Sequence, residues 1–354
     1  MGKLAVYKYV AAMFLVVQVI VSVFTIVALF GGDVNPVGSP ARAMLVYILP
    51  LFILANLLLL VYWLVRCHWF YALIPVLTLA CCIPYIGTIY QFSFQDHHEA
   101  EARSGVKIAS YNVAMFNREM SGFMAQDILA EMRRQKVDVL CIQEYNEVSG
   151  DKNNTESYKD YFPYHAKGRD DMIIFSRYPI TGRKTMLFDD TNNSAMWADI
   201  DVKGSDVRVF NVHLQTTGIN RTMYQADKLE KQNYEISTNR LLHTIYGNYM
   251  MGMMFRSGQA IEVANERAIS DKPVVLCGDF NDVPYSFVYQ TLLGNMVDGF
   301  KECGEGWMRT FRGKKAVRID YIFHDESLTG LSYYTSDLTY SDHYPVFMKI
   351  ALKN

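Results

Sequence analysis

Apolar residues near the start of the chain form three long runs that contain no Asp, Glu, Lys or Arg. They cover residues 9–32, 43–65 and 67–95. A helix needs roughly 20 apolar residues to cross a bilayer, so each run is long enough. Pro75, Pro84 and Gly87 fall in the third run, and membrane helices tolerate such residues. The pattern predicts three transmembrane helices that form a membrane anchor over residues 1–96.

Charged residues that flank the runs predict the orientation of this anchor. Lys3 and Lys8 precede the first run and Arg66 lies between the second and third, whereas Arg42 lies between the first and second. Positive residues favour the cytoplasmic side, so the N-terminus is expected inside and everything after the third run outside. A cleavable signal peptide is disfavoured, because the first apolar run is too long and no A-x-A-like site follows it.

The rest of the chain alternates short β-like runs with helical stretches. After a linker at residues 97–105, a catalytic domain is expected over residues 106–354. One helical period covers residues 121–136, and the second half of the domain repeats the pattern of the first. The apolar runs that predict strands are residues 106–112, 137–144, 171–176, 207–214, 273–280, 318–323 and 346–352. Continuous apolar runs are typical of strands buried on both faces, so an α/β domain with two similar halves is predicted.

Polar side chains stand directly at the ends of these apolar runs or in the turns beside them. α/β folds place their sites at the ends of buried strands, so these residues are candidates for the site. They are Asn112, Glu144, His213, Asp279, Asn281, Asp320, Asp342 and His343.

Composition excludes several classes of protein. The chain has 354 residues, of which 51% are hydrophobic and 14% aromatic, so intrinsic disorder is excluded. Six Cys in so long a chain exclude a disulfide-rich small domain. Residues 97–354 hold 30 basic and 34 acidic residues, a net charge of −4, which excludes a strongly basic nucleic-acid coat.

The candidate residues have the chemistry of phosphoester hydrolysis. Carboxylates and an amide suit Mg²⁺ or Mn²⁺, and no Cys belongs to the set. The chain has no H-E-x-x-H, C-x-x-C, Walker or G-x-S-x-G motif, which disfavours a zinc protease, an NTPase and a serine hydrolase. A divalent cation neutralises phosphate charge while a base activates water and an acid protonates the leaving oxygen.

Six short motifs resemble the endonuclease/exonuclease/phosphatase superfamily in their order along the chain. They are ASYNV (109–113), IQE (142–144), NVHL (211–214), GDFND (278–282), RIDYIF (318–323) and YSDHYPV (340–346). The resemblance covers residues 106–352 and implies a four-layer α/β sandwich, in which two mixed β-sheets are flanked by helices. It does not cover the anchor.

The resemblance also implies roles for the matching residues. Glu144 would be the main metal ligand with Asn112 beside it, and Asp342 would bind or support the metal. Asp279 would orient or deprotonate the attacking water, and Asn281 would orient the phosphate. His213 would contact the phosphate near the leaving group, and His343 with Asp320 would stabilise the transition state or act as base. Ala114 stands where some DNA-repair members carry an acidic residue, which does not favour a second metal there.

The sequence leaves three functions open: a phosphoester hydrolase, a nuclease and a non-catalytic binding module. The membrane anchor favours the first of them. Residues 92–105 reach at most about 50 Å when fully extended, so the site stays near the bilayer. This favours a metal-dependent phosphoester hydrolase acting on a lipid head group outside the cytoplasmic membrane. A nuclease is disfavoured by the negative domain, because duplex affinity depends on phosphate neutralisation. A non-catalytic membrane-anchored binding module is disfavoured by the complete set of acid, amide and histidine positions.

Several further residues outside the candidate set have expected roles, and two of these assignments have an alternative. The Tyr- and Met-rich residues 245–255 predict either a helix packed on the domain or an apolar lip that touches lipid. Arg177 is either a phosphate ligand or a turn residue. Packing is expected for Tyr111 and Tyr145, solvation for His97 and His98, and a strand end for His324.

Overall fold

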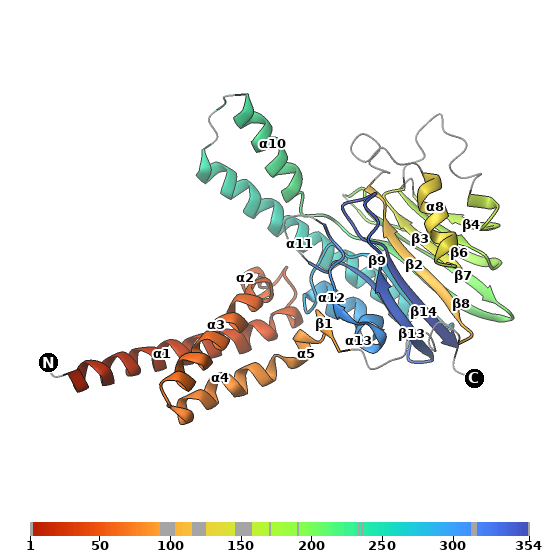
Figure 1. Cartoon of the computed structure of the whole chain (residues 1–354). Coiled ribbons are helices and arrows are strands. Elements are labelled where there is room, and N and C mark those ends of the chain that lie inside the picture. The colour runs from red at the N-terminus through yellow and green to blue at the C-terminus, as the bar shows by residue number, and fades with distance from the viewer. Residues whose placement is uncertain are drawn as a thin grey trace. The chain divides into compact units, whose positions relative to one another are not determined.

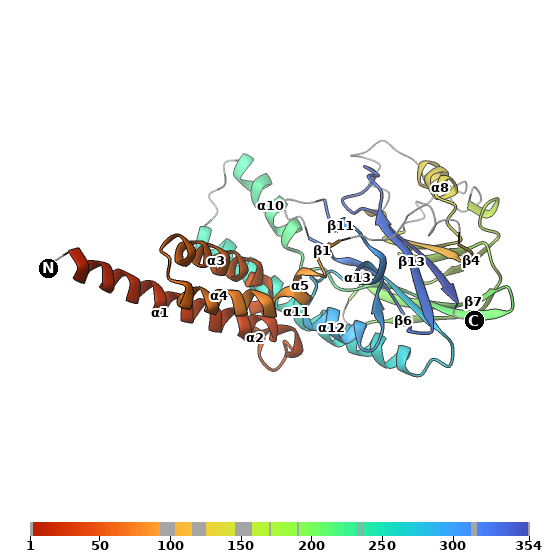
Figure 2. The ribbon, with the colours of Figure 1, turned by 60° about the horizontal axis from the view of Figure 1, so that its bottom comes forward.

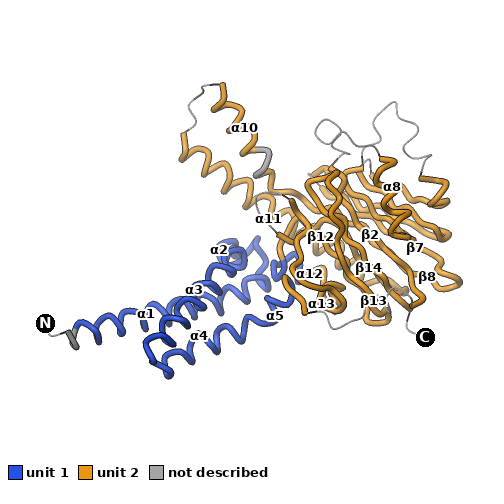
Figure 3. The backbone as a smooth tube through the Cα atoms, in the orientation of Figure 1, with its two compact units in different colours: residues 1–88, 284–290 blue, residues 89–283, 291–354 orange. Residues whose placement is uncertain are grey.

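The chain divides into two compact units in the computed structural model (Figure 3). The first contains residues 1–88 and 284–290, and the second contains residues 89–283 and 291–354. The structure describes residues 3–92, 103–114, 125–145, 158–169, 171–189, 191–232, 234, 237–312 and 317–352.

The first unit is helical. Its elements are α1 (Lys3–Leu29), the 3₁₀ turn η1 (Gly31–Asp33), α2 (Pro40–Ala43), α3 (Leu45–Val65), α4 (Trp69–Cys81) and α5 (Ile83–Ile86). Within the described residues, two helices are long and apolar enough to cross a membrane, Val6–Asp33 and Leu45–Val65.

The third apolar run does not form a helix of spanning length. It is divided between α4, which has 13 residues, and the four-residue α5. At 1.5 Å per residue, α4 measures about 20 Å, less than the ~30 Å hydrocarbon core. Pro84 contributes to the break, because proline has no N–H for the helix ladder. Helix length therefore supports two of the three predicted spans.

Polar side chains connect α1 to α3 inside this unit. Asn56 on α3 accepts hydrogen bonds from Gln18 Nε2 (2.9 Å) and Ser22 Oγ (3.0 Å), and its Nδ2 donates to Thr25 Oγ1 (2.7 Å). All four residues are buried. Hydrogen bonds between apolar helices hold them in register where the hydrophobic effect does not.

The second unit contains two six-stranded sheets. One has the order β10-β12-β9-β8-β7-β6 and the other β13-β14-β2-β3-β5-β4. A further two-stranded pair joins β1 (Tyr90–Gln91) to β11 (Gly306–Trp307). The bounds in the large sheets are β2 (Val106–Asn112), β3 (Val139–Gln143), β4 (Tyr164–Lys167), β5 (Met172–Ser176), β6 (Ile180–Leu187), β7 (Ser194–Val202), β8 (Ser205–His213), β9 (Val274–Asp279), β10 (Val297–Asp298), β12 (Asp320–His324), β13 (Leu328–Thr335) and β14 (Val346–Leu352).

The two sheets share one pattern of pairing. In each, a central parallel pair, β2–β3 or β8–β9, has antiparallel strands on both sides. This is the doubling expected from the sequence, and all seven predicted strands are present.

Helices cover the outer faces of the two sheets (Figures 1 and 2). On one side, Ile128, Leu129 and Met132 of α8 (Ala125–Arg134) pack with the outward residues of β2 and β3. On the other, Glu266 of α11 (Thr238–Ala268) contacts Lys184 and Trp197 on β6 and β7. The remaining helices of this unit are α10 (Ile219–Lys231) and α13 (Gly299–Cys303). The helix α12 (Phe287–Leu293) belongs to the first unit up to residue 290 and to the second from residue 291.

The space between the sheets is filled by their inward residues, which form one apolar cluster. Two mixed sheets with helices on the outer faces are the α/β architecture that the resemblance implied. Beyond this core, α10 and the first turns of α11 extend away from the sheets as a helical hairpin (Figures 1 and 2).

Candidate active site

The chemistry-bearing residues meet at one end of the two sheets. β2 ends at Asn112, and β3 ends one residue before Glu144. β8 ends at His213, directly opposite Asp279 at the end of β9. The antiparallel β12 begins at Asp320, which also pairs with Asp279. Because parallel strands end at the same edge and antiparallel strands begin there, the pairing itself assembles these side chains.

Two amides and two carboxylates form the centre of the group. Asn112 Nδ2 donates to Glu144 Oε1 (3.1 Å) and to Asp279 Oδ2 (3.0 Å), and so joins the two sheets. Asn281 donates to Asp279 twice, from Nδ2 to Oδ2 (3.2 Å) and from its backbone N–H to Oδ1 (2.8 Å). The Ala114 N–H donates to Asn112 Oδ1 (3.0 Å) and fixes the orientation of that amide.

His343 forms the first of two imidazole–carboxylate pairs. Its Nδ1 lies 3.1 and 3.0 Å from the two oxygens of Asp320, and its Nε2 lies 3.7 Å from Asp279 Oδ2. All three residues are buried. The rings of Phe311 and His343 form an edge-to-face contact, with 5.2 Å between their centroids. Asp320 therefore holds the ring so that Nε2 faces the carboxylate at the centre of the group.

His213 forms the second pair with Asp171, the residue just before β5. Nδ1 lies 3.2 Å from Asp171 Oδ2, and Nε2 lies 3.7 Å from Glu144 Oε1. Ser194 Oγ lies 3.5 Å from the other oxygen of Asp171. Each histidine thus contacts one carboxylate through Nδ1 and faces a second, central carboxylate with Nε2.

These carboxylates shift the pKa values of the histidines. Burial lowers the pKa of His343, but the charges of Asp320 and Asp279 outweigh burial and raise it to about 10. Burial likewise lowers the pKa of His213, and the hydrogen bond to Asp171 with the charges of Asp279 and Glu144 gives a net rise. The pKa of Asp279 is raised by burial, against the opposing charge of His343.

Unusual backbone conformations place two of the site residues. Glu144 and Asn281 have φ values of 53° and 52°, in the left-handed region that residues with a side chain rarely adopt. Gly278 has φ 140°, and a Cβ there would lie 1.9 Å from the carbonyl oxygen of Val212. The glycine of GDFND is therefore needed for β9 to approach β8.

Oxygen donors for a hard cation come from Glu144 and Asn112. The Glu144 side chain is 30% exposed, whereas that of Asp279 is 1% exposed, so Glu144 is the carboxylate that a ligand reaches. Ligand atoms of Asp279, Asp320 and His343 also lie within 4.8 Å of one another. That trio suits proton chemistry better, because both Asp320 oxygens face His343 and a protonated imidazole has no lone pair for a metal. Glu144 with Asn112 therefore fits Mg²⁺ or Mn²⁺.

Seven of the eight candidate residues from the sequence lie in this group, and Asp342 does not join it. Asp342 is exposed, and its carboxylate lies 3.4 Å from Ser341 Oγ. Arg177 is not a phosphate ligand at this site. It pairs with Asp138 (2.8 Å), which directly precedes β3, so it lies at the other end of the sheet.

The expectations for the other aromatic and histidine residues are met wherever the structure describes those residues. Tyr111 and Tyr145 are buried in the apolar cluster under α8, as predicted. His324 ends β12, where it is buried and lies 2.7 Å from Glu302. His97 and His98 lie outside the described residues.

Asp171 is a site residue that the sequence analysis missed. It stands directly before an apolar run, the same signal that identifies Asp320, but the pattern there indicates only the start of a strand. A buried polar layer beneath the site was also missed. There Gln143 Nε2 donates to Asn211 Oδ1 (2.6 Å) and Ser110 Oγ (3.1 Å), and Asn211 donates to carbonyl groups of the facing sheet.

A two-sheet α/β sandwich with oxygen donors and two His–Asp pairs at one end defines a phosphoesterase-like site. The family model of the Endonuclease/Exonuclease/phosphatase family matches residues 109–343, and the chain belongs to this family. Members of the family are usually hydrolases that act on phosphoester bonds and generally use divalent metals. A second model, for a domain of unknown function, matches residues 11–89. No curated protein matches the chain.

Solved structures of family members share the fold. One from Bacteroides vulgatus is 17% identical, with a TM-score of 0.51, and the match covers 71% of this chain and 100% of that one. One from Beutenbergia cavernae is 19% identical, with a TM-score of 0.51 and coverage of 71% and 72%. One from Bacteroides thetaiotaomicron is 17% identical, with a TM-score of 0.50 and coverage of 71% and 96%.

Proposed function

We propose that this chain is a membrane-anchored, Mg²⁺- or Mn²⁺-dependent phosphoester hydrolase that acts on lipid head groups. The observation that carries the chemistry is one continuous polar group across the two sheets. It combines the partly exposed carboxylate of Glu144, the buried amide of Asn112, the buried carboxylate of Asp279 and two oriented imidazoles, His213 with Asp171 and His343 with Asp320.

The residues of the group divide the reaction between them. Asp279 takes a proton from the attacking water, and its raised pKa suits it to accept one. The protonated His343 places a positive charge beside Asp279 and the phosphate, and Asn281 orients the phosphate. As the bond from phosphorus to the leaving oxygen breaks, His213 donates its proton to that oxygen. Glu144 and Asn112 would hold the cation, and the chemistry it would supply there is neutralisation of charge on the phosphate.

The location rests on the apolar helices of the first unit. Val6–Asp33 and Leu45–Val65 are long enough to anchor the chain in the cytoplasmic membrane. Lys3, Lys8 and Arg66 favour the cytoplasmic side, and an odd number of crossings then places the catalytic domain outside. This arrangement requires the third apolar run to cross as well, with α4, α5 and the residues around them as its spanning segment.

The helical hairpin supports a lipid substrate. Large apolar side chains on it are exposed, and we call them the hairpin patch: Met223, Tyr224, Leu229, Tyr234, Leu242 and Tyr246. Lys228, Lys231 and Arg240 on the same hairpin are exposed cations. Exposed aromatic and apolar residues with cations between them suit the interface of an anionic bilayer. The Met-rich residues 245–255 divide between the two earlier interpretations, since Met253 is buried and Met251 is 53% exposed.

A substrate panel on the purified full chain with Mg²⁺ tests the function. The panel contains a lipid phosphate and a lipid pyrophosphate in vesicles, sphingomyelin, a soluble phosphomonoester, and single- and double-stranded DNA. Turnover of a vesicle lipid above all soluble substrates is expected. Cleavage of DNA without lipid turnover would assign a nuclease, and no turnover of any substrate would assign a binding module.

A triple variant separates the lipid surface from the chemistry. Replacement of Tyr224, Leu242 and Tyr246 by Ser should reduce turnover in vesicles and leave turnover of a soluble phosphoester unchanged. Ser at Tyr164, Leu187 and Ile269, which are exposed apolar residues outside the hairpin, provides the matched control. Equal loss on both substrates in the hairpin variant would contradict the role of the hairpin patch.

A further inference from the structure

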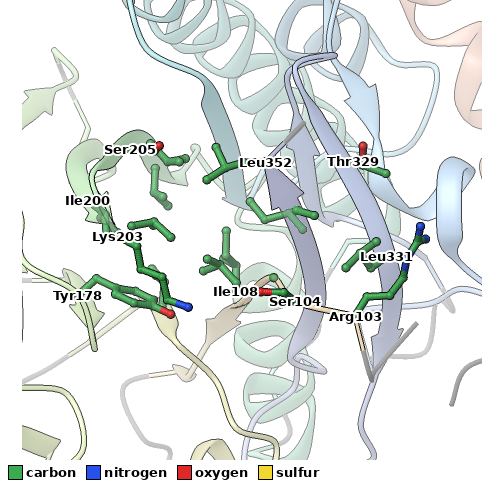
Figure 4. Close-up of a pocket in the computed structure, with 18 residues that line it drawn as sticks. Arg103, Ser104, Ile108, Tyr178, Ile200, Lys203, Ser205, Thr329, Leu331 and Leu352 are labelled. Carbon is green, nitrogen blue, oxygen red and sulfur yellow. The ribbon is translucent and has the colours of Figure 1, made fainter. Parts of the chain in front are cut away.

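A cavity of about 610 Å³ opens between the two sheets (Figure 4). It lies at the end of the sandwich opposite the candidate active site. Its lining includes Ser205, where β8 begins, whereas β8 ends at His213 in the active site. Eight residue rises along this strand separate the two places by roughly 26 Å. The cavity is therefore a separate compartment, and its volume falls within the range of roughly 300–1,000 Å³ that small-molecule sites occupy.

The walls of the cavity are apolar. They come from both sheets: from the starts of β2, β3 and β8, the ends of β7 and β14, and β13. The buried wall residues are Val106, Ile108, Val139, Ile200, Val202, Val207, Val209, Leu331 and Ile350. The same residues, apart from Leu331, belong to the apolar cluster between the sheets, so the cavity borders on that core.

The mouth of the cavity is polar and basic. Lys203 and Arg103 line it, together with the hydroxyl residues Ser104, Ser205 and Thr329, and no lining residue is acidic. Lys203 and Tyr178 lie on one side and Arg103 on the other (Figure 4). Both basic residues are exposed, and no carboxylate in the described part of the chain forms an ion pair with either of them.

The position of Lys203 is set by a tight turn. Lys203 and Gly204 form the two-residue connection between β7 and β8, with φ values of 57° and 92°. Positive φ at both central residues is the type I′ geometry that matches the twist of the two strands. Asn and Asp adopt this backbone conformation more readily than lysine does. The rigid hairpin nevertheless holds Lys203 in it, and so fixes the backbone position of this residue at the mouth.

We propose that this cavity binds the alkyl chain of a fatty acid, with the carboxylate held at the mouth by Lys203 and Arg103. Apolar walls stabilise an alkyl chain by about 25 cal/mol for each Å² removed from water. Two cations and no acid at the mouth select a negative end group over a neutral or positive one. The proposal concerns a second site and does not depend on the reaction at the first.

Photolabelling of the full chain in nanodiscs tests the proposal. The probe is decanoic acid with a diazirine on its alkyl chain, and labelled peptides are identified by mass spectrometry. Labels are expected on the peptides that contain Val207 and Leu352. Excess decanoate should remove them, whereas equal concentrations of decanol or decyltrimethylammonium should not. Removal by all three competitors would show a site without charge selection, and labels only on other peptides would show no site here.

Two variants test the walls and the mouth separately. Val207→Phe places a larger side chain in the cavity and should reduce labelling about tenfold or more. Lys203→Asn keeps a residue suited to the left-handed turn and should weaken binding about threefold to fivefold, as expected for one exposed ion pair. Lys136→Asn is the matched control, because Lys136 is exposed, has φ 56° and lies outside the cavity.

The variants overturn the proposal if they give the wrong pattern. Unchanged labelling in Val207→Phe, with a melting temperature like that of the wild type, would place the alkyl chain elsewhere. If Val207→Phe does not fold, Lys203→Asn still tests the proposal. Equal loss of probe binding in Lys203→Asn and Lys136→Asn would show that Lys203 does not hold the carboxylate. Phosphoester turnover, measured in parallel, reports on the active site alone.

Discussion

Replacing Arg256 by Met should destabilise the catalytic domain and its active-site loop. Arg256 on α11 lies within 3.3 Å of Asp282, the last residue of GDFND, and both side chains are 1% exposed. Arg256 Nη1 also donates to the carbonyl oxygen of Gln215 (3.1 Å), two residues after His213. The arginine therefore connects the long helix to the loop that directly follows His213 at the end of β8 and to the loop after β9 that contains Asn281.

The expected loss of stability follows from the burial of the Arg256–Asp282 ion pair. Removal of one partner of a buried ion pair leaves an uncompensated charge and costs about 3–5 kcal/mol. For a domain of this size, one kcal/mol lowers the melting temperature by about 2–4 °C, so a fall on the order of 10 °C is expected. The double variant Arg256→Met/Asp282→Asn removes the buried charge and should recover more than half of the loss.

Thermal unfolding of the purified chain, followed by circular dichroism, measures the effect. Arg240→Met is the matched control, because Arg240 is exposed on the same helix and its loss should leave melting unchanged. Phosphoester turnover should fall in Arg256→Met even at temperatures where the variant is folded, since the loop beside His213 and the loop that contains Asn281 lose their connection to α11. A melting temperature within about 1 °C of the wild type would refute the reasoning.

Three further changes have expected outcomes. Asp171→Asn removes the charge behind His213 and should lower kcat about 10- to 100-fold with little change in KM, in steady-state assays of a soluble phosphoester. Burial raises the pKa of Asp199, but hydrogen bonds from Arg208 and Lys272 outweigh burial, and the net effect is a lowered pKa. The ionised Asp199 therefore stabilises the domain at neutral pH, and this stabilisation is lost as the pH falls through the lowered pKa. Asp199→Asn should therefore destabilise the domain at pH 7, with a difference that shrinks below about pH 4 in denaturant titrations; a constant difference would contradict this. Asn56→Leu breaks the hydrogen bonds between α1 and α3 and should cost the anchor about 1–2 kcal/mol, seen as earlier labelling of the buried Cys82 on heating in detergent.

Strands that form a continuous apolar run were predictable, and strands that are exposed or interrupted by polar residues were not. β3 and β9 are apolar at nearly every position, which makes them visible in the sequence. β6 (Ile180–Leu187) has no buried residue and reads as a polar loop. β7 contains Asp199, which is only buried because Arg208 and Lys272 pair with it from other elements. Such pairing depends on the tertiary structure, and no local pattern reports it.

The site could be predicted where its residues end a buried strand. Asn112, His213 and Asp279 do so, and the ladder then brings them together. Asp342 was expected to reach the metal, but it is exposed while its neighbour His343 is buried. The conformation of the turn that begins at Ser341 determines that the side chain of His343, and not that of Asp342, points inward. Ser341 Oγ donates to the carbonyl oxygen of Asn112 and accepts the His343 N–H, an arrangement that sequence spacing does not contain.

The third apolar run shows the limit of counting apolar residues. Its length predicts a span, but the run breaks between α4 and α5, so helix length supports only two spans. The orientation of the catalytic domain depends on this count. Protease added to intact spheroplasts should remove the catalytic domain if it lies outside, and full protection until lysis would reverse the predicted topology.

The most direct test of metal-dependent hydrolysis is the turnover of a phosphoester by Glu144→Gln. This variant keeps the size of the side chain and its contact with Asn112 while removing the charge that a hard cation requires. Glu230→Gln, at an exposed position of α10, is the matched control. We expect Glu144→Gln to melt like the wild type and to lose Mg²⁺-dependent turnover by a factor on the order of 10² or more. Full turnover by Glu144→Gln, or by the wild type in excess chelator, would contradict the account.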